Sequence, residues 1–396
     1  MFPPPSPAFP FHGAFELRPV PAIRYGAGRA AETGAAARDL APAATTVALV
    51  VDPALHELGV DRPVLASLAE AGAEVAVFAE LGGEPKQKQL EAATDFVRSH
   101  SAGLVVCLGG GSAMDVGKVA AAIALTEHGP ADFAMDGLPL PKPGLPKICL
   151  PTTAGTGSEL SSTNIFTRSD GKKVWVWGTE TKPDLVLLDP ELTVSLPPRL
   201  TAWTGLDAFT HALEACTNRR RHPANDLYAH RALALVAAWL ETAVRGPADV
   251  AARGGMLLAS AYAGIAIDNC STGMAHNISH AIAALAPIHH GLATGLGLEA
   301  VLGWEVEAAE PDGPFAAAAE ACGLGRDARA LVDWYGDLID RCGVERRLPP
   351  AFQAFAAEDL EREMLAPETQ YMRQVTAREV SDADIARFAA RMMAMA

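Results

Sequence analysis

The stretch from Thr45 to Leu125 constrains the fold most, because strand-like and helix-like segments alternate through it. Apolar, strand-like runs cover 47–51, 74–78 and 104–108, and segments with helical periodicity cover 64–71, 86–100 and 112–125. A helix after each strand is the order that builds a parallel sheet covered on both faces. We therefore predict an α/β domain, with further strands at 148–150, 173–177 and 185–188.

The pattern changes at Leu196-Pro197-Pro198. Beyond it we find almost no strand-like run, and Ala/Leu-rich helical stretches follow at 202–217, 226–244, 250–267, 273–284, 292–307, 315–321, 328–340 and 382–395. We therefore predict two domains, an α/β domain over residues 1–196 and an all-helical domain over residues 197–396. Residues 1–25 are rich in proline, and we expect them to form an extended arm or an edge strand.

The composition narrows the class of protein. Hydrophobic residues make up 49% of the chain and the net charge is −15, so a large core is expected and a nucleic-acid or anionic-membrane partner is not. The one short basic run, Arg219–His222, is predicted to be a solvent-exposed helix end or loop. The six cysteines are scattered, which favours reduced thiols. The chain lacks a signal-like start and an uninterrupted membrane-length apolar run, so we expect a cytoplasmic protein.

A glycine turn, Gly109-Gly110-Gly111-Ser112, follows an apolar strand and opens a helix. Glycines let backbone N–H groups approach a phosphate, and the start of a helix favours negative charge. The spacing is neither G-x-G-x-x-G nor that of a nucleoside-triphosphate loop, so a tight structural turn remains the alternative. Asp115 lies in the first turn of this helix, where an acid is also structurally favourable.

Asp52 ends the first strand of the predicted sheet. Ligands of open parallel sheets lie at the carboxyl ends of the strands. An acid there would accept hydrogen bonds from the adenosine ribose and would repel a 2′-phosphate, which favours NAD over NADP. A helix-capping role before Pro53 is the alternative.

The helical half carries an acid and several histidines at helical spacing. Asp207 and His211 lie four residues apart, on one face of a predicted helix. The later histidines form two pairs, His276 with His280 and His289 with His290. A set of one carboxylate and several imidazoles suits Zn²⁺ or Fe²⁺ better than Ca²⁺ or Mg²⁺. Spacing alone does not decide which of the later histidines would bind, and hydrogen-bonded core histidines are the alternative.

Three stretches resemble the iron-containing (group III) alcohol dehydrogenases, which share their fold with dehydroquinate synthase. Gly109–Lys118 resembles the family's G-G-G-S-x-x-D-x-x-K motif, and Pro151–Glu159 resembles its P-T-T-A-G-T-G-S-E motif. Residues 205–215 followed by 273–291 resemble its metal-binding half. The resemblance covers essentially the whole chain and is weakest before residue 20 and after about residue 310. It implies a dinucleotide-binding α/β domain and an all-α metal-binding domain.

The resemblance also implies roles for individual residues. It assigns metal ligation to Asp207, His211, His276 and His290, and it places His280 near the substrate and the nicotinamide, where it could relay the alcohol proton. His289 is then a neighbour of the metal site. The implied cofactor contacts are Asp52, Gly111, Ser112, Thr152, Thr153, Ser161, Lys173 and Leu200, to which we add Gly110 and Asp115 of the glycine motif.

The implied activity is reversible hydride transfer between a small alcohol and NAD, with Fe²⁺ or Zn²⁺ as the Lewis acid. Relatives of this kind are dimers or larger. We keep three alternatives: a dehydroquinate-synthase-type lyase, a maleylacetate-reductase-like enzyme, and a non-catalytic regulator. The presence of Asp115 argues against the second, and the complete acid and histidine set argues against the third.

Three short segments depart from the family pattern. Glu84-Pro85 stands where the family often has Asn-Pro, which puts that cofactor contact in doubt. Trp175 and Trp177 lie in a predicted strand, and Ser162-Thr163-Asn164 follows the Thr-rich loop. These residues either reshape the substrate pocket or simply pack within the strand.

Overall fold

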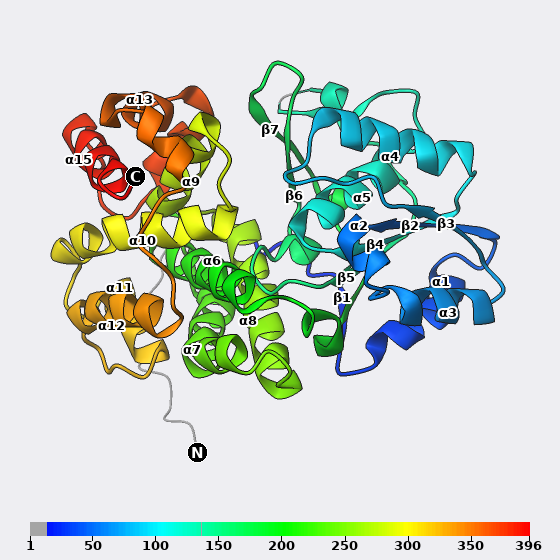
Figure 1. Ribbon diagram of the computed structural model, residues 1–396, viewed down its shortest axis with the longest axis horizontal. Coiled ribbons are helices and arrows are strands. Elements are labelled where there is room, and N and C mark those ends of the chain that lie inside the picture. Colours follow the sequence, from blue (N-terminus) through cyan, green and yellow to red (C-terminus); the bar gives the residue numbers. More distant parts are fainter. Residues whose placement is uncertain (1–13, 136) are drawn as a thin grey trace.

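The computed structural model describes residues 14–135 and 137–396, and it consists of a sheet-containing half and a helical half (Figure 1). The sheet has six parallel strands in the order β1 (Ala22–Tyr25), β8 (Leu185–Leu188), β5 (Lys147–Pro151), β4 (Leu104–Gly109), β2 (Thr46–Val51) and β3 (Glu74–Phe78). The predicted parallel sheet is therefore confirmed. Residues 22–25 form the predicted edge strand, whereas residues 1–13 of the predicted arm lie outside the described part.

Helices cover both faces of the sheet because its buried strands alternate their apolar side chains. Val47, Leu49 and Val51 of β2 pack with α1 (Thr33–Leu40) and α3 (Arg62–Glu70). Ala48 and Val50 point the other way, toward α4 (Gln87–Ser99) and α5 (Gly111–Ile123). Figure 1 shows these two helix pairs on opposite sides of the strands. The short helix α2 (Pro53–Glu57) follows β2 directly.

Two local predictions differ from the structure. The segment Lys173–Trp177 is a strand, β7, but it pairs antiparallel with the unpredicted β6 (Thr163–Thr167) in a separate hairpin outside the main sheet. The alanine-rich helix α1 was also missed, because its sequence TGAAARDL offers few large apolar residues from which to detect a period. The hairpin extends from the sheet half toward the helical half (Figure 1).

The chain is helical after residue 197, as predicted. The long helices are α6 (Pro198–Thr217), α7 (Pro223–Arg245), α8 (Val250–Cys270), α9 (Met274–Leu285) and α10 (His290–Glu307). Shorter helices follow, namely α11 (Pro314–Ala321), α12 (Ala328–Arg341), α13 (Ala357–Met364), α14 (Gln370–Val375) and α15 (Asp382–Met393). Of these, α13 and α14 had not been predicted.

Helix α8 belongs to both halves of the core. Leu257, Ala261 and Ile265 pack in the apolar core that the sheet shares with α4 and α5. Met256 and Ala259 pack in the apolar core of the helical half. This helix is long and apolar enough to cross a membrane by length and composition alone, but 72% of its most apolar window is buried inside the protein. Such burial on two sides is what a core helix requires. It also fixes the two halves against each other.

Candidate active site

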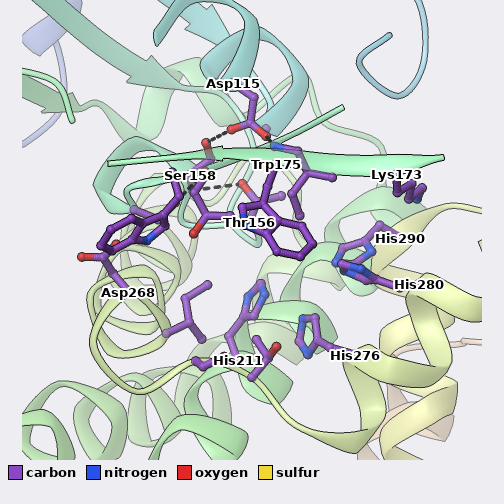
Figure 2. Close-up of a pocket in the computed structure, with 18 of the residues that line it drawn as sticks. Asp115, Thr156, Ser158, Lys173, Trp175, His211, Asp268, His276, His280 and His290 are labelled. Atoms are coloured by element: carbon purple, nitrogen blue, oxygen red, sulfur yellow. Dashed lines mark hydrogen bonds between the residues drawn. The ribbon is translucent and has the colours of Figure 1, made fainter. Parts of the chain in front are cut away.

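Helices α6, α9 and α10 bring one carboxylate and three imidazoles to a single point. Asp207 and His211 come from α6, His276 from α9, and His290 is the first residue of α10. The Nε2 atoms of the three histidines lie 3.9, 3.8 and 3.7 Å from Oδ1 of Asp207. All four potential ligand atoms lie within 4.8 Å of one another. Figure 2 shows the three imidazole rings at one end of a pocket.

Each histidine is oriented by a partner on its other ring nitrogen. His276 Nδ1 lies 2.6 Å from Oε2 of Glu214, and His211 Nδ1 lies 3.3 Å from the carbonyl oxygen of Gly155. His290 Nδ1 lies 3.0 Å from Oγ of Ser279. Metal-binding histidines in proteins are usually held in this way, with the second nitrogen bonded to a carboxylate, carbonyl or hydroxyl oxygen. The three Nε2 atoms are thereby left to face Asp207.

Glu214 was missed by the sequence reasoning, although it lies three residues beyond His211 on the same helix. Its carboxylate also accepts hydrogen bonds from the backbone nitrogens of Gly273 at 2.8 Å and Ala275 at 2.7 Å, at the start of α9. Glu214 therefore joins α6 to α9 and fixes the ring of His276. Its position seven residues after Asp207, two helical turns along the same face, is the signal that could have revealed it.

The residues of this cluster fit a divalent metal. Oδ1 of Asp207 and Nε2 of His276 are fully buried and have no hydrogen-bond partner in the structure. Burial raises the pKa of Asp207, but His211, His290 and His276 outweigh it, so the pKa is lowered on balance and the group is a carboxylate. Buried polar atoms without partners are costly, and a cation shared between them removes that cost. A set of three nitrogens and one oxygen matches Zn²⁺ or Fe²⁺.

The two remaining histidines lie beside the cluster. The ring of His280 is 6.5 Å from that of His276 and 5.8 Å from that of His290, between centroids. Burial holds the pKa of His280 well below its usual range, so its ring is neutral. His289 instead caps α10 by accepting a hydrogen bond from the backbone nitrogen of Gly291 at 3.2 Å.

Asp52 and the glycine turn, two of the candidate cofactor features, lie where the strand order of the sheet reverses. Strands β3 and β4 flank β2 on opposite sides, and the carboxyl ends of β2 and β4 form the crevice in which such sheets bind ligands. Asp52 and the glycine turn follow these two strands, with Leu108 paired to Val51. Asp52 Oδ1 accepts from the backbone nitrogen of Ala54 at 2.9 Å. The alternative capping role of Asp52 is thus present in the structure.

The glycine turn packs directly on the Thr-rich loop. A Cβ atom at Gly110 would lie 3.3 Å from the side chain of Thr153, and one at Gly111 would lie 3.0 Å from that of Thr156. The backbone nitrogen of Thr152 donates to the carbonyl oxygen of Gly109 at 2.9 Å. Glycine at these two positions therefore lets the turn approach the loop more closely than a larger residue would. Leu200 is half-buried in the first turn of α6.

Asp115 has partners within the chain. Its carboxylate accepts from Oγ of Ser158 and from the backbone nitrogen of Ile165 at 3.0 Å, and it lies 3.7 Å from Nζ of Lys118. Lys118 is fully buried and donates to the carbonyl oxygens of Ser158 at 2.6 Å and Ser161 at 3.2 Å. Asp115 and Lys118 thus brace the Thr-rich loop and the β6–β7 hairpin against α5.

Lys173 and Glu84 explain one departure from the family pattern. Lys173 Nζ lies 2.9 Å from a carboxylate oxygen of Glu84. The acid that stands where the family often has asparagine therefore pairs with a lysine assigned to the cofactor. Ser112 lies close by, because its hydroxyl donates to the carbonyl oxygen of Gly83 at 3.0 Å.

A cavity of about 580 Å³ joins the two halves of the site. Of the candidate cofactor residues, Gly111, Ser112, Asp115, Ser161 and Lys173 line it. His211, His276, His280 and His290 line it from the helical half. Asp52, Gly110, Thr152, Thr153 and Leu200 do not line it.

Comparison with known proteins places the chain in a family. The family described as iron-containing alcohol dehydrogenase matches residues 21–190, and the C-terminal domain of the Fe-containing alcohol dehydrogenase family matches residues 201–366. The chain is 33% identical to a choline dehydrogenase of Bacillus subtilis over 83% of each protein. It is 38% identical to a sulfoacetaldehyde reductase of Bilophila wadsworthia, over 62% of this chain and 63% of that protein.

A solved structure shows the same fold over nearly the whole chain. The sulfoacetaldehyde reductase of Bifidobacterium kashiwanohense in complex with NAD⁺ has a TM-score of 0.85 and 30% identity, covering 94% of this chain and 97% of that one. The likeness between the two chains extends over both the sheet-containing half and the helical half. The chain belongs to the iron-containing alcohol dehydrogenase family. Its relatives favour alcohol–aldehyde oxidoreduction over the lyase and maleylacetate-reductase alternatives.

Proposed function

We propose that this protein is a metal-dependent alcohol dehydrogenase or aldehyde reductase that transfers a hydride between a small alcohol and NAD. One observation carries the proposal: the three histidines whose Nε2 atoms converge on Asp207 line the same cavity as Gly111 and Ser112 of the glycine turn. A site for a Lewis-acidic metal and a site for a dinucleotide thus share one space.

The metal would be held by Asp207, His211, His276 and His290, and it would be Fe²⁺ or Zn²⁺ because both accept this set of donors. Bound there, a divalent ion supplies Lewis-acid polarisation of the substrate oxygen. His280 is our candidate for moving the alcohol proton. Its neutral ring can accept a proton, and it lies at the cavity beside two of the proposed ligands.

The dinucleotide would lie at the carboxyl ends of β2 and β4. Its proposed contacts are Asp52, Gly110, Gly111, Ser112, Asp115, Thr152, Thr153, Ser161, Lys173 and Leu200. The charge of Asp52 favours NAD over NADP, and NAD⁺ is the ligand of the related sulfoacetaldehyde reductase structure. As in the family resemblance, we propose a homodimer or larger homo-oligomer in the cytoplasm.

The test is a panel of alcohols and aldehydes with NAD(H) and NADP(H), followed at the absorbance of NADH, with the protein loaded with Fe²⁺ or Zn²⁺. We expect stoichiometric NADH formation from alcohols, dependence on the added metal, and a preference for NAD. Full activity in a metal-free preparation, or NAD use without net turnover, would contradict the proposal.

A further inference from the structure

The cavity extends well beyond the histidine cluster. In Figure 2 the imidazoles of His280 and His290 lie at one end, Asp268 lies at the other, and Trp175 lies between them. We call the end near Asp268 the distal end. Among the lining residues, Arg18 contacts Asp268, Asn269 and Trp177 there. Arg220 also lines the cavity, and the adjoining Asn218 is bonded to Cys270, two residues after Asp268. A substrate whose oxygen is near the histidines would direct its other end there.

Arg18 is held in place at the distal end. Its backbone nitrogen donates to Oδ1 of Asn269 at 2.8 Å, and its Nη1 donates to the carbonyl oxygen of Asp268. The guanidinium lies over the ring of Trp177, with its central carbon 4.8 Å from the ring centroid. None of these contacts neutralises the guanidinium charge. Arg18 is therefore a fixed cation whose other N–H groups have no acceptor among the residues that the structure describes.

Arg220 is the second cation of the distal end. It belongs to the basic run between α6 and α7 that was predicted to be an exposed loop, and its exposure agrees with that prediction. Its side chain nevertheless lines the cavity and has no hydrogen-bond or ion-pair partner within residues 14–135 and 137–396. The backbone is anchored, because the nitrogen of Arg220 donates to Oδ1 of Asn218 at 2.8 Å and Asn218 Nδ2 donates to the carbonyl oxygen of Cys270 at 2.8 Å.

The carboxylates that line the cavity do not balance these arginines. Each of the four already has a lysine partner, at the distances Glu84–Lys173 2.9 Å, Asp115–Lys118 3.7 Å, Asp268–Lys182 2.7 Å and Glu368–Lys172 3.3 Å. Asp268 also accepts from the backbone nitrogen of Ser162 at 2.7 Å. A protein with a net charge of −15 therefore places two uncompensated guanidinium groups at one end of its cavity.

We propose that Arg18 and Arg220 bind an anionic group of the substrate, so that the preferred substrates are short alcohols or aldehydes carrying a sulfonate or a carboxylate. Guanidinium groups bind such anions through charge-assisted hydrogen bonds. A quaternary ammonium group is disfavoured, because it would meet both arginines and because Arg18 covers a face of Trp177. This inference rests on the proposed function, since it concerns the substrate of the same site.

Three aldehydes of nearly equal shape test the charge preference. Sulfoacetaldehyde, 3,3-dimethylbutanal and betaine aldehyde each join a –CH₂–CHO group to a tetrahedral head, and the head is anionic, neutral or cationic. We expect kcat/KM with NADH to be highest for sulfoacetaldehyde, intermediate for 3,3-dimethylbutanal and lowest for betaine aldehyde. Each value should exceed the next by at least about tenfold. Succinate semialdehyde carries a carboxylate instead, and its rank against sulfoacetaldehyde shows which anion the site prefers.

Arg220→Ala is the cleaner variant, because Arg18 also holds the backbone of Asp268. We expect it to lower kcat/KM for sulfoacetaldehyde by about five- to tenfold, mainly through KM, and to change that for 3,3-dimethylbutanal by less than about twofold. Arg220→Lys should recover part of the loss. Arg347→Ala removes the same charge from an exposed position outside the cavity and should change neither value.

The outcomes separate this inference from the proposed function. Turnover of all three aldehydes with equal kcat/KM, or a preference for betaine aldehyde, would overturn the anion site and leave the dehydrogenase intact. An equal loss for charged and neutral aldehydes in Arg220→Ala would also overturn it. No turnover of any aldehyde or alcohol by metal-loaded protein would instead overturn the proposed function.

Discussion

Two clusters of buried polar groups, one in each half of the molecule, differ in whether the chain itself supplies their partners. On the sheet side, Asp115 and Lys118 are bonded to each other and to the loop and hairpin around them. On the helical side, Asp207 Oδ1 and His276 Nε2 are buried without partners. The first arrangement is complete within the chain, and the second becomes complete only with a ligand. Polar groups whose hydrogen bonds are all made within the chain therefore indicate a structural brace. Buried polar atoms that converge without hydrogen-bond partners indicate a binding site.

The largest effect should follow from removing one of the four proposed metal ligands. His276→Ala removes one proposed ligand, so we expect loss of bound metal and a fall in turnover of at least about 10³-fold. Metal content by elemental analysis and NADH absorbance measure the two effects. His289→Ala is the matched control, because His289 caps α10 outside the cluster, and this variant should keep its metal. Metal retained at wild-type stoichiometry in His276→Ala would contradict the assignment.

A smaller effect should follow from disrupting the hydrogen-bonded network around Asp115 and Lys118. Lys118→Met removes the cation beside Asp115 and two hydrogen bonds to loop carbonyls, so we expect the free energy of unfolding to fall by about 3 kcal/mol. Urea unfolding measures it. Lys88→Met, at an exposed position on α4, should change it by less than about 0.5 kcal/mol. Equal stability of the two variants would show that the network is not a brace.

A third effect, which depends on pH, concerns a buried carboxyl group in the helical half. Burial, and then the charge of Glu214, raises the pKa of Glu305 from its usual 4.5 to about 8. The folded state therefore holds this proton more tightly than the unfolded state. The resulting stabilisation is complete below pH 4.5 and is lost as the pH rises through 8. The contrast with Asp115 is that Glu305 has no ion-pair partner among the described residues.

Glu305→Gln keeps a neutral side chain at every pH. Relative to wild type, we expect its Tm to rise by about 5 °C between pH 5 and pH 9, as wild type loses the stabilisation described above. Thermal unfolding followed by circular dichroism at several pH values measures this. Glu358→Gln on the surface of α13 should show no such trend. A difference in Tm between Glu305→Gln and wild type that stays the same at every pH would refute the titration of Glu305.

Much of the fold followed from local pattern. The strands of the main sheet between 46 and 188, the glycine turn and the long helices after 197 were predictable, because buried parallel strands and apolar helices have clear periods. The β6–β7 hairpin was not, because pairing between Thr163–Thr167 and Lys173–Trp177 depends on partners across a turn. Within β7, Trp175 and Trp177 face the cavity while Val174 and Val176 are buried in the core. Of the two uses considered for these tryptophans, their positions fit the one of lining the pocket, and the valines provide the packing.

The sequence by itself determined the chemistry available to the site: an acid and histidines at helical spacing, a glycine turn after a strand, and an excess of negative charge. Tertiary structure alone decided which of these groups meet. It gathered the candidate ligands from three helices, set Glu214 behind His276, and turned Arg220 of a surface loop toward the cavity. The reason is physical, since helical spacing fixes neighbours only within one helix, whereas packing between helices sets every distance that spans two of them.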